Sequence, residues 1–373
     1  MKWLFWISAV GIVYAYVGYA AWLWLRSKWA PRPVRRGMVE PSVSAVMVVK
    51  NEEAVLARKM ENLLALEYST GKLEVVVVSD GSSDQTAAIL KQFGADSRVR
   101  AFLKPESEGK ALGLNDAIRL ASGEIVLFTD ARQTIEPAAL RLLVENFADP
   151  AVGCASGELM LGDPASGETG SGMGLYWRIE KKVREMESAG GSVVGATGAI
   201  YCARRALFEA LPAGTILDDV LIPMQVVRAG SRVIFDSRAR AWDSPDLGGG
   251  REFSRKVRTL SGNYQLLQLA PWLLSSRNPI RFEFISHKLS RLTVPFALVA
   301  LLVTSLFVPQ PLYRAVLAAQ LGFYALSVLA VLGWKIGPLS RIADAARTFV
   351  VLNSAAMVAF VNFMTGRKAV WVR

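Results

Sequence analysis

Carboxylates and cationic side chains must carry the chemistry of this chain, because histidine and cysteine are scarce. Of 373 residues, one is a histidine, His287, and two are cysteines, Cys154 and Cys202. Two isolated cysteines are too few for a disulfide framework or a zinc site. A Ser-His-Asp or Cys-His mechanism would have to use His287, which stands beside an apolar run and for which we expect a structural role. Catalysis and ligand binding must therefore rest on Asp, Glu, Lys and Arg.

Three short polar segments follow apolar, strand-like runs. They are Lys50-Asn51-Glu52-Glu53, Ser79-Asp80-Gly81-Ser82-Ser83-Asp84 and Asp130-Ala131-Arg132. Each segment alone is also what a turn or a helix cap requires. In a parallel sheet, however, the carboxyl ends of the strands meet at one edge, where ligands bind. Three polar loops at one edge, two of them with an Asp just beyond an apolar strand, predict a ligand site.

Residues 44–160 alternate between strand-like and helix-like runs. Strands are predicted at 44–49, 73–78, 99–103 and 124–129, and helices at 52–66, 84–93, 110–120 and 137–147. This order predicts an α/β fold with a doubly wound, mainly parallel sheet. The sequence contains no P-loop, and no Gly-x-Gly-x-x-Gly motif follows a strand, which disfavours an ATPase or a Rossmann dehydrogenase.

Four uncharged runs, at residues 3–25, 292–313, 315–334 and 348–366, are candidates for membrane helices. The first three reach the roughly 20 apolar residues that a bilayer core requires, whereas the fourth contains Asn353 and Asn362. No small-residue cleavage site precedes Arg26, so we interpret the first run as a retained anchor and not as a signal peptide. Cations are more numerous behind this run than in front of it, which predicts that residues 26–290 are cytoplasmic.

The formal net charge of +11 lies largely beside these apolar runs. Attraction to anionic lipid and to phosphorylated substrates explains this better than nucleic acid, which we do not expect as a partner. Residues 264–272 and 282–292 are amphipathic and predict helices on the membrane surface. We therefore divide the chain into an N-terminal membrane helix (1–26), a catalytic domain (40–262), interfacial helices (263–291) and C-terminal membrane helices (292–366).

The order of these motifs resembles that of the family 2 inverting glycosyltransferases with the GT-A fold. The resemblance is strongest to the membrane-embedded bacterial polysaccharide and chito-oligosaccharide synthases, and it covers roughly residues 42–265. Besides the polar loops, it rests on Gly109-Lys110-Ala111-Leu112-Gly113-Leu114-Asn115, on the segment 195–205, on Leu217-Asp218-Asp219 in place of Thr-Glu-Asp, and on Arg255-Lys256-Val257-Arg258-Thr259 in place of Gln-x-x-Arg-Trp.

The resemblance implies a role for each matching residue. Lys50, Asn51, Glu52 and Asp80 would bind the base and ribose of the donor, and Lys110 would line the nucleotide pocket. Asp130 would hold Mg²⁺ or Mn²⁺ on the diphosphate, with Arg132, Arg255 and Arg258 on the donor side. Gly198 and Asp218 would face the acceptor, and Asp219 would be the catalytic base. These residue types suit the reaction, since a leaving diphosphate needs cations and an attacking hydroxyl needs a carboxylate base.

Two positions depart from the family pattern. Arg132 replaces the second Asp of Asp-x-Asp, so one metal ligand is missing and a cation stands in its place. Thr259 replaces the Trp that helps to form the acceptor site of processive synthases. We therefore expect a divalent cation held by one carboxylate, and a product that is extended by one sugar or a few.

The resemblance implies a multi-pass protein of the bacterial inner membrane that acts in cell-surface polysaccharide synthesis. Its donor would be a nucleotide sugar, with uridine as the base, and a hexosyl or N-acetylhexosaminyl group would pass to a saccharide or lipid-linked acceptor. Other proteins of the pathway could be partners. Two alternatives stay open: a polyprenyl-phosphate monoglycosyltransferase, and a non-catalytic membrane subunit with a regulatory nucleotide site. The side of the C-terminus also stays open, because three helices place it outside whereas Arg367, Lys368 and Arg373 favour the inside.

Overall fold

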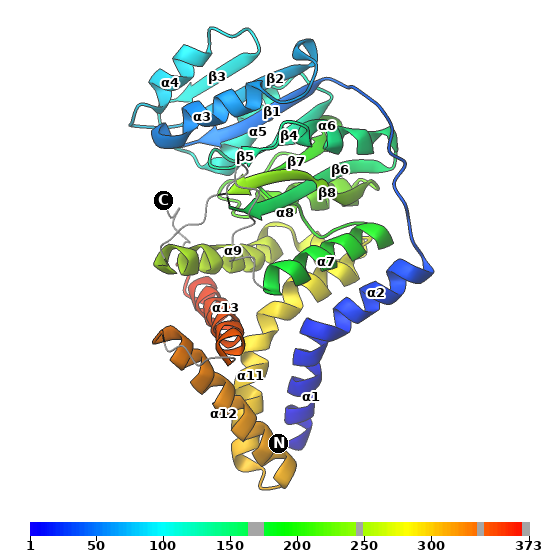
Figure 1. The fold of residues 1–373 in the computed structure, drawn as a ribbon, viewed down its shortest axis with the longest axis vertical. Helices are drawn as coiled ribbons and strands as arrows, with labels where there is room; N and C mark the ends of the chain where they lie inside the picture. The colour runs from blue at the N-terminus through cyan, green and yellow to red at the C-terminus, as the bar shows by residue number, and fades with distance from the viewer. Residues whose placement is uncertain (163–174, 244–248, 334–338, 368–373) are drawn as a thin grey trace.

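An α/β domain stands above a group of long apolar helices in the computed structural model (Figure 1), which describes residues 1–162, 175–243, 249–333 and 339–367. The domain is built on an eight-stranded sheet of order β3-β2-β1-β4-β7-β6-β8-β5. This architecture confirms the predicted α/β class.

The first four strands form the predicted parallel part of the sheet. They are β1 (Val43–Val49), β2 (Leu73–Asp80), β3 (Val99–Lys104) and β4 (Ile125–Phe128), and β1 pairs in parallel with both β2 and β4. Every residue of β1 is buried, because its side chains alternate between two apolar layers. Helices α3 (Glu53–Leu64), α4 (Thr86–Phe93) and α6 (Ala139–Val144) cover one face, and α5 (Lys110–Leu120) and α8 (Asp218–Arg228) cover the other.

The second half of the sheet contains strands beyond those predicted. It consists of β5 (Thr134–Ile135), β6 (Val152–Leu161), β7 (Tyr201–Arg204) and β8 (Arg232–Asp243). Strand β7 is antiparallel to both β4 and β6, whereas β6 and β8 are parallel. The sheet is therefore mixed beyond β4, and the antiparallel β7 brings the loop before it next to the end of β4.

Each of the four predicted apolar runs largely coincides with a helix that is long and apolar enough to cross a membrane, although the run 292–313 continues past the end of its helix and residue 334 lies outside the described residues. These helices are Lys2–Trp29, Arg281–Phe307, Pro311–Val331 and Ser340–Met364. The first comprises α1 (Lys2–Val13), η1 (Tyr14–Gly18) and α2 (Tyr19–Trp29), and the second comprises α10 (Arg281–Phe284), η6 (Ile285–Leu289) and α11 (Ser290–Phe307). The last two are α12 (Pro311–Val331) and α13 (Ser340–Met364). The predicted surface stretch 282–292 is thus continuous with a membrane-type helix.

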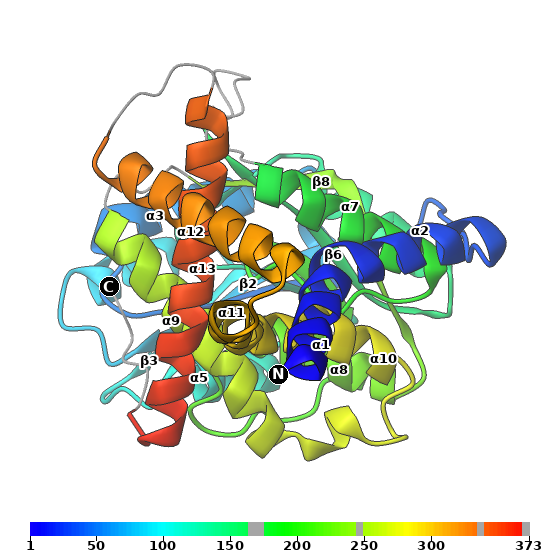
Figure 2. The ribbon, with the colours of Figure 1, turned by 90° about the horizontal axis from the view of Figure 1, so that it is seen from below.

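The last helix, α13, lies across the direction of α1 and α11. Figure 2 looks along α1 and α11, whereas α13 is seen over its whole length. Its C-terminal part packs under α9 (Gly249–Leu269), where Tyr264 stacks on Phe363 with ring centroids 5.3 Å apart. Helix α9 also runs across the domain boundary predicted at residue 262.

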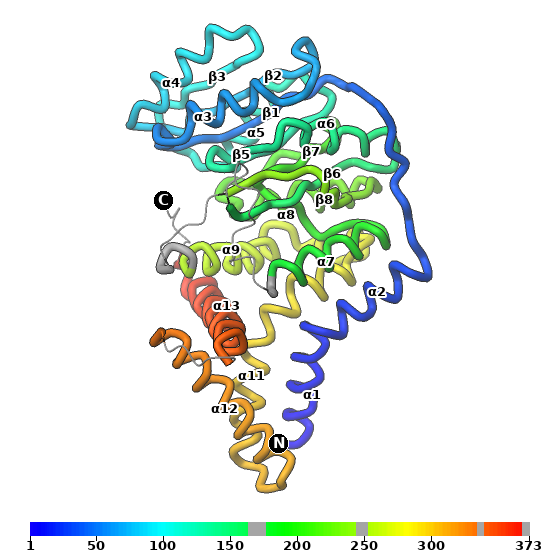
Figure 3. The backbone as a smooth tube through the Cα atoms, in the orientation of Figure 1, coloured from blue at the N-terminus to red at the C-terminus, as the bar shows by residue number. Residues whose placement is uncertain are grey.

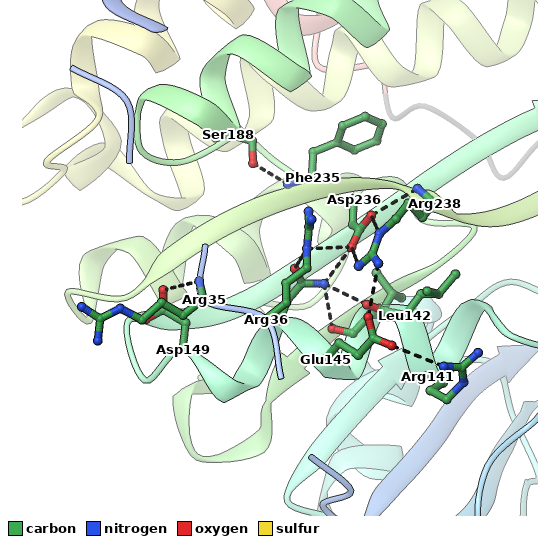
Figure 4. A network of polar contacts seen from close by, with 12 residues as sticks. Arg35, Arg36, Arg141, Leu142, Glu145, Asp149, Ser188, Phe235, Asp236 and Arg238 are labelled. Atoms are coloured by element: carbon green, nitrogen blue, oxygen red, sulfur yellow. Dashed lines mark hydrogen bonds and ion pairs between the residues drawn. The ribbon is translucent and has the colours of Figure 1, made fainter. Parts of the chain in front are cut away.

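The segment between α2 and β1 is fastened to the back of the domain, as Figure 4 shows. The Arg35 backbone N–H donates to Asp149 Oδ2 at 3.3 Å, and Arg36 Nε donates to Asn146 Oδ1 at 3.1 Å. The Arg36 guanidinium also lies 3.7 Å from Asp236 Oδ2 on β8. These arginines, whose charge predicts the membrane orientation, therefore also attach the first long apolar helix to the domain.

Candidate active site

The loops after β1 and β2 are joined by hydrogen bonds. Asn51 has a positive φ of 54°, its Oδ1 accepts from the Ser83 N–H at 2.8 Å, and its own N–H donates to Ser82 Oγ at 3.1 Å. The Glu52 N–H donates to Thr86 Oγ1 at 3.0 Å. Lys50 lies half-buried beside them. The first two predicted polar loops thus form one unit at the edge of the sheet, as their sequence positions predict.

Asp80 organises the segment that leads into α5. Its buried carboxylate accepts hydrogen bonds from Ser107 Oγ at 2.7 Å and from the N–H groups of Glu108 and Gly109 at 2.8 and 2.9 Å. The next residue, Gly81, has φ of 63°, and a Cβ there would lie 2.5 Å from the Ser107 nitrogen. The contacts of Asp80 thus hold residues 107–109 against the strand, and its role at the nucleobase stays a prediction.

Lys110 connects two of the predicted site carboxylates. Its Nζ lies 2.9 Å from Asp130 Oδ1, beyond the end of β4, and 3.0 Å from Asp218 Oδ2, in the first turn of α8. Burial alone would lower the pKa of Lys110, but these carboxylates outweigh it and raise the pKa above its ordinary value. Lys110 therefore stays charged between the two acidic groups, where it can contact a phosphate.

Asp219 and Asp130 approach the same point of the backbone. A Cβ at Gly198 would lie 3.4 Å from Asp130 Oδ2 and 3.6 Å from Asp219 Oδ2. The Ala196 N–H donates to the Asp219 backbone carbonyl at 2.7 Å and holds the loop before β7 against α8. Burial, followed by the neighbouring Asp218, raises the pKa of Asp219 to about 6. A carboxylate with this pKa accepts a proton near neutral pH, as a general base must.

The residues around Asp130 suit a divalent cation whose remaining coordination positions are filled by water and the phosphates of the substrate. The described residues contain no group of three or more His, Cys, Asp or Glu side chains that could hold a metal ion by themselves. Mg²⁺ is usually bound through one or two carboxylates together with water and substrate phosphates. The Asp130 side chain is 41% exposed and meets this requirement. The nearby Arg132 lies 3.7 Å from Asp243 Oδ2, and its charge acts to lower the pKa of Glu52, which burial raises.

The predicted arginines of the last motif lie on α9. Arg255 and Arg258 are half-buried there, and Thr259 is exposed. Figure 1 places α9 below the sheet, between the domain and α13. The contact of either arginine with a diphosphate stays a prediction.

A buried lysine behind the Asp130 loop is absent from the predicted site. Lys59 Nζ donates to Thr129 Oγ1 and to the Gln133 carbonyl, both at 2.8 Å, and the residue is 1% exposed. Burial lowers the pKa of Lys59 to about 7. A signal for it exists in the sequence, because Lys59 stands within the apolar stripe of α3 formed by Leu56, Met60 and Leu63. A charged residue in such a stripe indicates a buried polar contact.

Comparison with known proteins gives a family for the domain. Residues 44–211 match the model of Glycosyl transferase family 2. The chain is 24% identical over 235 residues to the poly-beta-1,6-N-acetyl-D-glucosamine synthase of Staphylococcus aureus strain COL, covering 60% of this chain and 55% of that protein. It is 36% identical over 122 residues to an N-acetylglucosaminyltransferase of Rhizobium sp. strain N33, covering 32% and 27%. The matches therefore span about half of the curated relatives, or less.

A solved structure resembles the chain over nearly its whole length. It is the mannosyltransferase PcManGT from Pyrobaculum calidifontis in complex with GDP-Man and Mn²⁺, with a TM-score of 0.73 at 21% sequence identity. The superposition covers 98% of this chain and 99% of that one. The likeness confirms the predicted fold, a GT-A-type α/β domain with apolar helices.

Proposed function

We propose that the chain, whose residues 44–211 match Glycosyl transferase family 2, is a membrane-bound inverting glycosyltransferase. It takes a sugar from a nucleotide donor, with UDP as the expected carrier, and gives it to a saccharide or lipid-linked saccharide. The observation that carries this proposal is the approach of Asp130 and Asp219 to Gly198, with Lys110 paired to Asp130. Asp130 can hold a cation on the leaving diphosphate, and Asp219 can accept the proton of the attacking hydroxyl.

The reaction needs one proton acceptor and several cations. The acceptor hydroxyl oxygen attacks the anomeric carbon, the bond from that carbon to the diphosphate oxygen breaks, and the nucleoside diphosphate leaves with the bonding electrons. The hydroxyl proton passes to the carboxylate of Asp219, whose pKa of about 6 leaves it deprotonated at neutral pH. Lys110 lies where it can contact the diphosphate, and Arg132, Arg255 and Arg258 are the further cations that we assign to the donor.

Asp130 would hold a divalent cation, Mg²⁺ or Mn²⁺, together with the diphosphate. Such an ion supplies electrostatic stabilisation of the charge that develops on the leaving group. The exposed carboxylate of Asp130 fits this purpose, and the solved mannosyltransferase of the same fold is in complex with Mn²⁺. The relatives named above are N-acetylglucosamine and mannose enzymes, so we propose a hexosyl or N-acetylhexosaminyl group and a role in cell-surface polysaccharide synthesis.

We place the protein in the bacterial inner membrane with its catalytic domain in the cytoplasm. Helices α1, α11 and α12 cross the bilayer, and α13 lies along its cytoplasmic surface, under α9. This arrangement is supported by the orientation of α13 across α1 and α11 in Figure 2. It returns Thr365 and Arg367 to the side of the domain, as the positive-inside rule favours for a cation.

The proposal is tested with membranes that contain the full-length protein and a panel of labelled nucleotide sugars, including UDP-N-acetylglucosamine and GDP-mannose. We expect nucleoside diphosphate release together with label in the saccharide or lipid fraction. Asp219→Asn should reduce transfer by roughly 10²-fold or more, the usual contribution of a positioned base, while donor binding stays nearly unchanged. Asp344→Asn, at an exposed carboxylate of α13, is the matched control and should have no effect. Transfer at the wild-type rate by Asp219→Asn would contradict the assignment.

A further inference from the structure

The loop 129–133 carries Asp130 between β4 and β5, and one buried lysine holds both of its ends. Lys59 Nζ donates to Thr129 Oγ1, at the first residue of the loop, and to the carbonyl of Gln133, at the last residue, both at 2.8 Å. Figure 3 shows α3, the helix that contains Lys59, beside β5. A single side chain of α3 therefore spans the loop that presents Asp130 to the proposed site.

The middle of the loop is also held by α3, but at the surface. Arg58 Nη2 donates to the Arg132 carbonyl at 2.9 Å, and Arg58 is exposed. Lys59 is only 1% exposed, so water cannot take the place of its hydrogen bonds. Removal of a buried donor leaves its acceptors unsatisfied, which costs more than the loss of an exposed hydrogen bond. Of the two neighbouring residues, Lys59 is therefore the one on which the position of the loop depends more.

Thr129 extends this contact to the loop before β7. Its hydroxyl has one hydrogen, whose nearest acceptor is the Ala199 carbonyl at 2.8 Å, so the hydroxyl oxygen must accept from Lys59. Thr129 is 5% exposed. Ala199 directly follows Gly198, the residue that the Asp130 carboxylate approaches. The buried chain from Lys59 through Thr129 to Ala199 therefore holds the two loops of the site in one relative position.

The hydrogen bonds of Lys59 do not depend on its charge. Both acceptors are neutral oxygens, and an amine and an ammonium each have at least two N–H groups to donate. Burial lowers the pKa of Lys59 to about 7, so the side chain can lose its proton near neutral pH and still make both contacts. These properties suit a residue that positions the loop.

We propose that Lys59 is a positioning residue, which sets the place of the Asp130 carboxylate through Thr129 and Gln133 and thereby the affinity of the site for a divalent cation with a nucleoside diphosphate. The inference rests on the proposed function for the role of Asp130, and Lys59 itself does not touch the substrate. Because Mg²⁺ demands near-ideal octahedral geometry at about 2.0 Å, a small displacement of its carboxylate ligand weakens binding.

Cation binding is measured directly, without any need for sugar transfer. Full-length protein in detergent is titrated with Mn²⁺ in the presence of UDP and, in parallel, of GDP, and free Mn²⁺ is followed by electron paramagnetic resonance. Lys59→Met removes the amine and keeps a long side chain. We expect it to weaken Mn²⁺ binding about tenfold, within the usual range for groups that orient a metal ligand.

A second variant separates the hydrogen bonds of Lys59 from its charge. Thr129→Val leaves the lysine in place and removes the hydroxyl that joins it to the loop, so Mn²⁺ binding should weaken to a similar extent. The effects of the two substitutions should not add in the double variant, because both break the same chain of contacts. Wild-type Mn²⁺ binding in Lys59→Met would overturn the inference. Wild-type binding in Thr129→Val would also overturn it, since the charge of Lys59 would then act without the contact.

The matched control for a general loss of stability is Leu90→Ala. Leu90 is a buried residue of α4 in the apolar layer that α3 and α4 share. Its truncation leaves a cavity and should lower the thermal unfolding midpoint, whereas Mn²⁺ binding should stay unchanged. Weakening of Mn²⁺ binding in Leu90→Ala equal to that in Lys59→Met would mean that Lys59 acts only through stability, and would overturn the inference.

Activity then separates this inference from the proposed function. In Lys59→Met the Mn²⁺ concentration for half-maximal transfer should rise about tenfold, whereas kcat at saturating Mn²⁺ should change less. A wild-type protein that binds Mn²⁺ with the nucleotide but releases no nucleoside diphosphate from any sugar donor would contradict the function alone. Active enzyme with the same Mn²⁺ requirement in Lys59→Met would contradict the inference alone. A wild-type protein that binds no Mn²⁺ with either nucleotide would overturn the cation site and the inference together.

Discussion

The ammonium of Lys110 lies 3.0 Å from the carboxylate of Asp218, the residue that directly precedes the proposed base Asp219. After burial, the charge of Asp218 is the largest cause that raises the pKa of Asp219 to about 6. The two neighbouring carboxylates therefore have different roles. Asp218 pairs with Lys110 and raises the pKa of Asp219, and Asp219 accepts the proton.

Asp218→Asn should move the acidic limb of the pH profile to lower pH. In the wild type, kcat/KM should fall as the pH drops through about 6, because protonated Asp219 cannot act as a base. Removing the Asp218 charge lowers the pKa of Asp219, so the variant should keep a larger share of its own maximal rate at acidic pH. The measurement is kcat/KM for sugar transfer across the acidic to neutral range. A limb at the same pH in both proteins would mean that another group controls it.

Chelation should suppress transfer, and added Mn²⁺ or Mg²⁺ should restore it. One exposed carboxylate, Asp130, together with a diphosphate makes a usable site for a hard cation. The check is nucleoside diphosphate release after chelation and after re-addition of each ion, with Arg132→Ala measured in parallel. Activity that survives chelation in the wild type but is abolished in Arg132→Ala would mean that the arginine has taken the place of the ion.

Stability should rise with pH because of Lys59, and Lys59→Met should reduce this dependence. Lys59 has a pKa of about 7 in the folded chain against an ordinary value of 10.5. Between these values the unfolded chain binds more protons than the folded chain, so unfolding becomes less favourable as the pH rises, by up to about 1.4 kcal/mol per pH unit. Below about pH 7 the contribution of Lys59 to the free energy of unfolding does not change with pH.

The measurement is the thermal unfolding midpoint of the full-length protein in detergent at neutral and at alkaline pH. Lys91→Met, which removes an exposed lysine from α4, is the control and should keep the wild-type slope. An unchanged slope in Lys59→Met would mean that Lys59 is charged in the folded chain over the whole range.

Purified enzyme with excess donor should add one sugar or a few to each acceptor. A processive enzyme needs an aromatic platform for its growing chain, since sugar rings pack poorly on a hydroxyl-bearing side chain such as Thr259. Two other aromatic residues are engaged elsewhere. Trp242 is 7% exposed and donates to Glu136, and Tyr264 is 9% exposed and stacks on Phe363. Sizing of the products decides the matter: a short ladder agrees with this expectation, and high-molecular-weight polymer made by this chain alone would refute it.

Single cysteines placed before α12 and after α13 should react with a labelling reagent from opposite sides of the membrane. Gln310→Cys, in the exposed turn between α11 and α12, should react with an impermeant maleimide in intact spheroplasts. Thr365→Cys, after α13, should react only in inverted vesicles. The native thiols of Cys154 and Cys202 are buried and give little background. Labelling of both positions from outside would mean that α13 crosses the bilayer.

The parallel half of the fold was predictable because its signals are local. Val43–Val49 and Leu73–Asp80 are almost entirely buried, and each contains an unbroken apolar run in the sequence, at 45–49 and 75–78. The antiparallel half was not predictable in the same way. The pairing of β7 with both β4 and β6 depends on contacts between segments that are distant in the chain.

The same distinction holds for the candidate site. Asp130 and Asp219 could be named from their motifs, but their approach to Gly198 requires the antiparallel turn before β7. Lys59 could have been found as a charge in an apolar stripe. The orientation of α13 is likewise decided by packing, since its composition alone suits a membrane span.

The attachments of the domain have a consequence for how the two substrates meet. Arg36 fastens the segment after α2 to Asp236 on the back of the sheet, and Tyr264 on α9 stacks on Phe363 of α13. In the proposed membrane arrangement, these two separate attachments would hold the site at one height above the bilayer. A lipid-linked acceptor would then reach the site by lateral diffusion in the leaflet, whereas the donor would arrive from bulk solution. The rate should therefore follow the mole fraction of acceptor in the membrane and stay the same when the vesicles are diluted at saturating donor.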